Sequence, residues 1–255
     1  AKKVIEISAI PRMSDATLEE AAIEQAIMEH TKRVSDAVVD AIGEGLFPVI
    51  IGGDHTSAIG FHTGLARAHG QTGIIWMDTH PDLNTPETSP SGNIHGMMLA
   101  GLLGHGSEQM LAATSASQTL DEHVAMAGIR SIDEGEQQRL NDGSINCMTM
   151  DAVHEKGLEA CMSDAIETAN QAEAGFGLTI DIDVLDPSQA PFVATPVEGG
   201  IDVDHLAAAM TALPQTNRLL GVEVVEFTPR DDSDAEAACA IIATLVNAVT
   251  SLPAV

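Results

Sequence analysis

The sequence predicts a single three-layer α/β domain built around a central, mostly parallel β-sheet. Apolar runs of strand length alternate with helical patterns along the whole chain. The runs are apolar throughout rather than half polar, which is typical of parallel strands buried on both faces. With 255 residues, 44% of them hydrophobic, the chain can bury one such core, and no repeat, low-complexity tract or linker divides it. We therefore expect residues 1–255 to form one domain.

The spacing of apolar residues predicts each element in turn. Strands are expected over residues 3–10, 47–51, 73–77, 122–129, 144–148, 177–183 and 219–226. Helices are expected over residues 18–44, 57–68, 95–103, 157–174, 203–212 and 234–251, with one more beginning in the segment SIDEGEQQRL. Gly43 and Gly45 end the first helix, and the acids of SIDEGEQQRL lie in a first turn, where the helix dipole favours them.

Composition indicates which classes of partner are excluded and in which cell compartment the protein is expected. The chain has 38 acidic and 11 basic residues, a formal charge of −27. This argues against nucleic acid and anionic membranes, because both attract clustered Lys and Arg. Three cysteines without a CxxC spacing indicate reduced thiols, and we find neither a signal peptide nor an apolar run of membrane-spanning length. We expect a cytoplasmic protein without a nucleic-acid or membrane partner.

A candidate metal site follows the strand at residues 73–77. Asp78, His80 and Asp82 occupy alternate positions there, so on an extended chain their side chains project to one side. Two carboxylates and an imidazole at the end of a buried strand need an opposite charge, which a divalent metal supplies. The alternative is a solvated polar loop that happens to follow a strand.

Similar residues follow other predicted strands, and ligands of open parallel sheets bind beyond the carboxyl ends of the strands. Taken singly, His55 is more often a structural residue or helix cap, and Asp181 and Asp183 are more often loop-capping acids. Their shared placement at strand ends favours a metal centre. The candidate ligands are His55, Asp78, His80, Asp82, Asp181 and Asp183. This set suits Mn²⁺, with Mg²⁺, Fe²⁺ or Co²⁺ possible, and six ligands favour two ions and metal-assisted hydrolysis.

Four segments carry a resemblance to a known family. GGDHTSAIG, MDTHPDLNTPETSPSGNIHG, TIDIDVLDPSQAPFVATPVEGG and VEVVEFTP resemble, in order, the signature blocks of the ureohydrolases (arginase, agmatinase and relatives). Within that family, NTPETSPSGNIHG resembles the bacterial arginase type. The resemblance implies one α/β domain with an eight-stranded parallel sheet, assembled as homotrimers or homohexamers. The family normally has a further strand before the point where this chain starts, so we expect that N-terminal strand to be missing from the sheet.

The resemblance also implies roles for individual residues. The six candidate ligands would hold two Mn²⁺ ions per subunit, with Asp183 also stabilising the charge of the tetrahedral intermediate. His95 matches the proton shuttle, and Glu226 matches the acid that grips the substrate guanidinium. The other implied substrate-binding residues are Asn84, Ser91 and Asn93 for the amino-acid carboxylate, Asp133 for the α-amino group, Glu136 in support of Asp133, and Thr195 beside the guanidinium.

The implied reaction is hydrolysis of the L-arginine guanidinium to L-ornithine and urea by a hydroxide that bridges two manganese ions. A carboxylate such as Glu226 can pair with two N–H groups of the planar guanidinium, and a histidine such as His95 can deliver a proton near neutral pH. One alternative is a ureohydrolase for agmatine, guanidinobutyrate or another guanidino compound. The other is a non-catalytic metal-binding member of the family.

Overall fold

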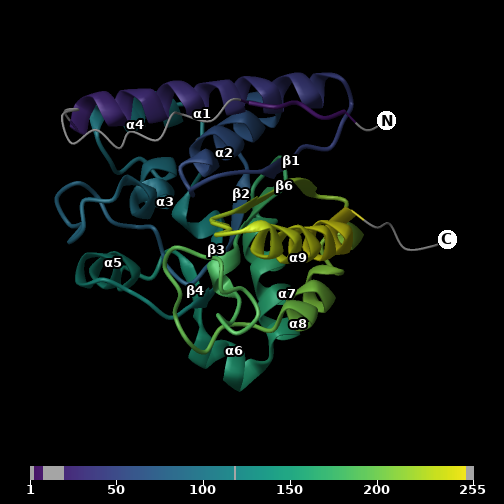
Figure 1. The fold of residues 1–255 in the computed structure, drawn as a ribbon. Helices are drawn as coiled ribbons and strands as arrows, with labels where there is room; N and C mark the ends of the chain where they lie inside the picture. Colours follow the sequence, from purple (N-terminus) through teal and green to yellow (C-terminus); the bar gives the residue numbers. More distant parts are fainter. Residues whose placement is uncertain (1–2, 8–19, 118, 251–255) are drawn as a thin grey trace.

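The computed structural model describes residues 3–7, 20–117 and 119–250 (Figure 1). Its core is a sheet of six strands, all parallel, in the order β1-β6-β5-β2-β3-β4. The strands are β1 (Val49–Ile51), β2 (Gly73–Met77), β3 (Val124–Ile129), β4 (Asn146–Thr149), β5 (Phe176–Asp181) and β6 (Leu219–Val225). Helices cover both faces, which confirms the predicted three-layer α/β domain.

The helices divide between the two faces of the sheet. On one side lie α1 (Glu20–Gly43), α2 (Ser57–His69), α3 (Met98–Leu102), α4 (Glu108–Thr114) and α5 (Glu134–Leu140). On the other lie α6 (Met150–Lys156), α7 (Leu158–Ala169), α8 (Val203–Met210) and α9 (Asp232–Thr250). Figure 1 shows α1 as the outermost helix, lying across α2 rather than on the sheet itself.

The strand pleat explains how one sheet supports both layers. In β2, Ile74 and Trp76 are buried in the core with α2, whereas Ile75 and Met77 are buried in the core with α7. Glycine lets α1 approach α2 closely: a Cβ added at Gly60 would lie 2.4 Å from a carbonyl oxygen of α1. These apolar layers fix the strands, so the loops at their carboxyl ends are held in place.

The predicted elements differ from the observed ones at several places. Residues 3–7 carry no strand, with Val4 95% exposed, and residues 8–10 lie outside the described part, as do residues 18–19 of the predicted first helix. The resemblance implied eight strands, whereas six form in the described residues. Helices α4 and α6 have seven residues each, too few for a clear helical period, and so were not predicted; α5, of the same length, was predicted from the acids of its first turn. The Ser107 side chain caps α4 by accepting from the Met110 amide.

Among the described helices, α9 is the one with the length and composition of a membrane span, with a mean hydropathy of 1.2. The helix also contains Asp232, Asp234 and Glu236, so its apolar residues do not form one uninterrupted run of that length. Ala238, Ile242, Leu245 and Val249 form a buried face on α9, and this face belongs to the same core as α7 and α8. Since 22% of its most apolar window is buried, α9 packs on the core along this one face.

Candidate metal centre and substrate pocket

Loops from the carboxyl ends of β1, β2 and β5 bring a first group of metal-ligating atoms together. The His55 Nδ1 atom lies 3.2 Å from Asp78 Oδ2, 3.1 Å from Asp82 Oδ2 and 3.3 Å from Asp181 Oδ2. All four residues are buried, and neither ring nitrogen of His55 has a hydrogen-bond partner. Four ligating atoms thus converge without the hydrogen bonds that would otherwise satisfy the imidazole.

A second group shares Asp78 with the first. The His80 Nδ1 atom lies 3.6 Å from Asp78 Oδ1 and 3.2 Å from Asp183 Oδ2, so the two oxygens of Asp78 serve different groups. The Asp183 amide donates to Asp181 Oδ1 at 2.8 Å, which joins the last carboxylate of the first group to the second. The structure therefore brings together all six residues that the sequence predicts as ligands.

Electrostatics at this centre favour a cation. Burial, together with the charge of Asp78, raises the pKa of Asp82 to about 6. Burial and the charges of Asp183 and Asp78 raise the pKa of Asp181 well above its usual range. A divalent ion would offset this repulsion between buried carboxylates, and carboxylate oxygens with imidazole nitrogens form a donor set that suits Mn²⁺. The residues present fit a metal centre.

Local backbone conformation sets the direction of the Asp82 and Glu226 side chains. Asp82 has a φ of 51° and Glu226 a φ of 65°, both in the left-handed region that non-glycine residues rarely adopt. The Glu226 amide donates to the Gly53 carbonyl at 2.9 Å, and Glu226 Oε1 accepts from the His55 amide at 2.8 Å. Glu226 therefore helps to hold the loop that carries His55.

His95 lies beside Glu226. The turn at Ile94–Met97 places His95 Nδ1 3.0 Å from Glu226 Oε1. The Glu226 carboxylate raises the pKa of His95, although burial opposes the shift. Burial alone would raise the pKa of Glu226, but the imidazole outweighs it and lowers that pKa. An acid and a base are thus poised next to the metal centre.

The remaining predicted residues line one cavity of about 290 Å³ above the ligands. The Asn84 Nδ2 atom donates to Asp133 Oδ2 at 2.9 Å. Buried Glu136 accepts from the Leu83 amide at 3.1 Å and the Asp133 amide at 2.9 Å. Its burial raises its pKa to about 7. The predicted residues on the cavity wall are His80, Asp82, Asn84, Ser91, Asn93, His95, Asp133, Glu136, Asp181 and Thr195.

The cavity has a buried floor and an open rim. The ligands at its floor are mostly buried, whereas Ser91, Asn93, Asp133 and Thr195 are exposed. The Thr195 hydroxyl donates to Asp183 Oδ2 at 2.9 Å, which links the rim to the floor. A molecule of extended shape could therefore contact both ends at once.

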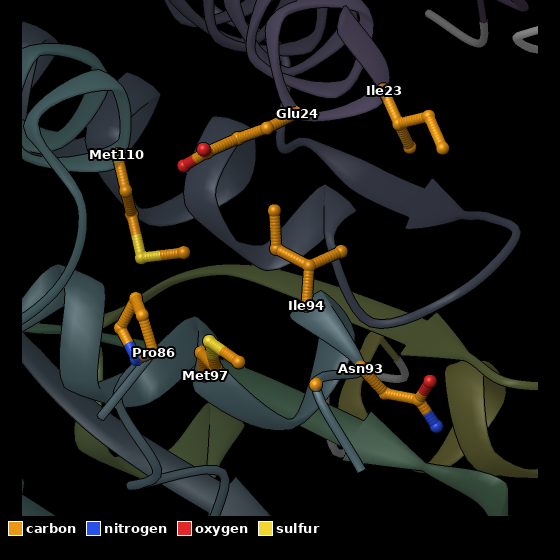
Figure 2. A pocket seen from close by; sticks show the side chains of 8 residues that line it. Ile23, Glu24, Pro86, Asn93, Ile94, Met97 and Met110 are labelled. Atoms are coloured by element: carbon orange, nitrogen blue, oxygen red, sulfur yellow. The ribbon is translucent and has the colours of Figure 1, made fainter. Parts of the chain in front are cut away.

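A second cavity, of about 520 Å³, lies between α1, α4 and the turn that carries His95 (Figure 2). In Figure 2, Ile94 points toward Glu24 and Met110, and the Asn93 amide points away from them. Ile94 and Met97 belong to the same apolar cluster as Met110 and α1. Apolar packing against α1 and α4 therefore supports the turn that carries His95.

Three residues of the centre were missed by the sequence reasoning. Trp76 stacks on His55 with ring centroids 4.2 Å apart, and its Nε1 donates to Asp78 Oδ2 at 2.9 Å. Thr79 donates through its hydroxyl to the Asp183 carbonyl at 2.7 Å, and Arg130 donates to the same carbonyl at 2.9 Å. Trp76 could have been found, since it lies two positions before Asp78 and so on the same strand face.

A family model described as the arginase family matches residues 6–250. The chain belongs to the arginase family. It is 38% identical to the arginase of Bacillus caldovelox over 222 residues, 87% of this chain and 74% of that protein. It is 37% identical to the arginase of Bacillus subtilis over 205 residues, 80% of this chain and 69% of that protein. This confirms the ureohydrolase resemblance.

Solved structures agree. The arginase of Bacillus caldovelox superposes with a TM-score of 0.84 at 33% identity, covering 99% of this chain and 84% of that one. The arginase of Bacillus cereus gives a TM-score of 0.83 at 34% identity, covering 90% and 79%. A formimidoylglutamase from Bacillus subtilis shares the fold at 22% identity, with a TM-score of 0.73 and coverage of 93% and 70%. The substrate must therefore be argued from the pocket, because the fold serves more than one.

Proposed function

We propose that this chain hydrolyses the guanidinium group of L-arginine to L-ornithine and urea, using two Mn²⁺ ions. One observation carries the proposal: a single cavity, with the candidate ligands His80, Asp82 and Asp181 on its wall, also reaches a separate polar set around Asn84, Asp133 and Glu136. A substrate with a guanidinium at one end and an amino acid at the other matches both ends.

His55, Asp78, Asp82 and Asp181 would hold the first ion, and Asp78, His80 and Asp183 the second. Bound there, the ions would supply a Lewis-acid centre that makes water nucleophilic at neutral pH. The buried carboxylates orient this centre, and their repulsion explains why the site would take up cations strongly.

Glu226 and His95 would act on the guanidinium. A carboxylate can accept two N–H groups of a planar guanidinium, so Glu226 would fix the plane of the reacting carbon. A protonated His95, held 3.0 Å from Glu226, would give a proton to the departing ornithine nitrogen. Thr195, on the same wall, would lie beside the guanidinium.

The residues at the rim of the cavity would bind the amino-acid end of the substrate. Asn84, Ser91 and Asn93 offer amide and hydroxyl donors for the α-carboxylate. The Asp133 carboxylate would pair with the α-ammonium, and Glu136 keeps Asp133 in place by accepting from its amide. Agmatine lacks the α-carboxylate, so these donors distinguish the two substrates.

Urea release from arginine and from agmatine, with Mn²⁺ added, tests the proposal. We expect arginine to be preferred, and we expect Asn93→Ala to lower the arginine-to-agmatine ratio of kcat/KM about 10-fold, the value of one hydrogen bond to a charged group. Asn247→Ala, an exposed change on α9, serves as the control. Preference for agmatine would favour the first alternative. Binding of Mn²⁺ without urea release from any guanidino compound would favour a non-catalytic protein.

Three further proposals follow, the first two supported by the family resemblance and the third by three cysteines without a CxxC spacing. Residues 1–255 form one ureohydrolase domain, the chain assembles as a homotrimer or homohexamer, and the protein acts in the cytoplasm. Light scattering of the purified chain would give its mass in solution, and a monomer would contradict the assembly.

A further inference from the structure

A buried polar row lies one pleat below the candidate metal centre. Trp76 of β2, Thr179 of β5 and Glu223 of β6 are partners across neighbouring strands. Asp78 and Asp181 lie two positions further along, so they project from the same face of the sheet. The row therefore supports the ligands directly from beneath, and no step of the proposed reaction uses Glu223.

The Glu223 carboxylate joins three segments. It has no exposed surface, and its Oε1 accepts from the Ser57 hydroxyl at 2.7 Å while its Oε2 accepts from the Thr179 hydroxyl at 3.1 Å. Since Thr179 donates to Glu223, the His62 Nε2 atom, 2.8 Å from Thr179, acts as a donor. Gly177 makes room for this imidazole, because a Cβ there would lie 2.9 Å from His62 Cε1.

This carboxylate is costly to bury. In the described part of the chain, no Lys or Arg forms an ion pair with Glu223. Burial raises its pKa to about 7, and the charge of His55 opposes that rise. Burial likewise lowers the pKa of His62 to about 3, so this imidazole is neutral and supplies no counter-charge. The positive charge that lowers the Glu223 pKa is that of His55, on the side of the candidate metal centre.

We propose that Glu223 is a positioning residue for the first metal group, holding His55 and Asp181 in place for a cation. It acts through Ser57, which begins α2 two residues after His55, and through Thr179, two residues before Asp181. Trp76 packs on the His55 ring. The imidazole is therefore held by this ring contact and, through the chain, by the hydrogen bond from Ser57 to Glu223. The inference rests on the proposed metal centre, and outer partners of this kind orient metal ligands.

Mn²⁺ binding to the metal-free protein, residues 1–255, tests the inference without any substrate. Titration calorimetry and metal analysis would be applied to Glu223→Gln, which keeps the shape of the side chain, and to Ser57→Ala, which keeps the charge. We expect each variant to bind one of the two ions about 10-fold more weakly and to change the affinity of the other less than about 2-fold. Glu159→Gln removes an exposed charge on α7 and should bind both ions as the wild type does.

Thermal unfolding of the metal-free protein separates positioning from a general structural role. Because Glu223→Gln removes a buried charge that lacks a cation, its unfolding midpoint without metal should equal or exceed that of the wild type. Wild-type affinity in both variants would overturn the inference. So would an equal loss of both ions with a lower metal-free midpoint, or the same loss in Glu159→Gln. If the wild type bound no Mn²⁺ at all, the proposed function would fail as well.

Discussion

Replacing Arg130 with lysine should loosen the loop between Asp183 and Val197, which borders the candidate metal centre. The Arg130 guanidinium donates over 2.8–3.4 Å to backbone carbonyls of the segments on either side of it. These are the carbonyls of Gly128, Asp183, Val184, Leu185, Val197 and Glu198. A lysine ammonium has three N–H groups at one point, so it can satisfy only about half of them.

The size of the effect follows from the bonds that are lost. Losing about three hydrogen bonds, each with a net contribution of about 0.5–1.5 kcal/mol, should lower the free energy of unfolding by roughly 2–4 kcal/mol. For a chain of this size, that corresponds to a fall in Tm of roughly 5–15 °C. Circular dichroism on the metal-free protein would measure it.

Arg230→Lys is the matched control. Arg230 is exposed and pairs with one partner, Asp234, so its replacement should leave Tm nearly unchanged. A Tm for Arg130→Lys within about 2 °C of the wild type would refute the view that this guanidinium organises the loop.

Three further changes test the centre and the packing beneath it. His55→Ala removes the nitrogen shared by the first group, so metal analysis should find one Mn²⁺ ion bound where we expect the wild type to bind two; retention of both would contradict the ligand assignment. Because Glu226 raises the pKa of His95 above 6.5, their pairing should add stability below pH 6.5 and lose it as the pH rises through the raised value. Glu226→Gln should bring the His95 pKa down in an imidazole NMR titration of metal-free protein, and an unchanged pKa would count against the pairing. Gly60→Ala places a Cβ 2.4 Å from the Thr31 carbonyl oxygen, so it should lower the free energy of unfolding by about 1–3 kcal/mol in urea, and an unshifted midpoint would show that α1 moves freely.

The sequence predicted that the candidate ligands lie close together, but the strand alternation did not predict how they are grouped. Alternation after β2 suggested that Asp78, His80 and Asp82 share one side, and the three do face one centre. They nevertheless divide between two groups, because the chain leaves the extended conformation and turns at Asp82 with a φ of 51°. Period-2 reasoning holds only while the backbone remains a strand.

The order of the strands in the sheet explains which other contacts could be predicted from the sequence and which could not. His55 and Asp181 meet because β1, β6, β5 and β2 are consecutive in the sheet, and the placement of ligands at strand ends anticipated that meeting. Most partners of Glu223 and Arg130 lie far away in the sequence, and those of Arg130 are backbone carbonyls, which cannot be recognised from a pattern of side chains. A charged residue inside the apolar run LLGVEVV was the one visible signal of the buried row.

The centre combines features that each oppose folding. Asp82 and Glu226 are two of the three non-glycine residues with positive φ in the described chain, and such strain costs of order 1–3 kcal/mol per residue. The carboxylates of Asp181 and Glu223 are buried, with pKa values raised by that burial. Ligands that bind only the folded state add to its stability, so a bound cation would offset these costs. The strain and the buried charge therefore follow from the need to hold several oxygens toward one point before any ion arrives.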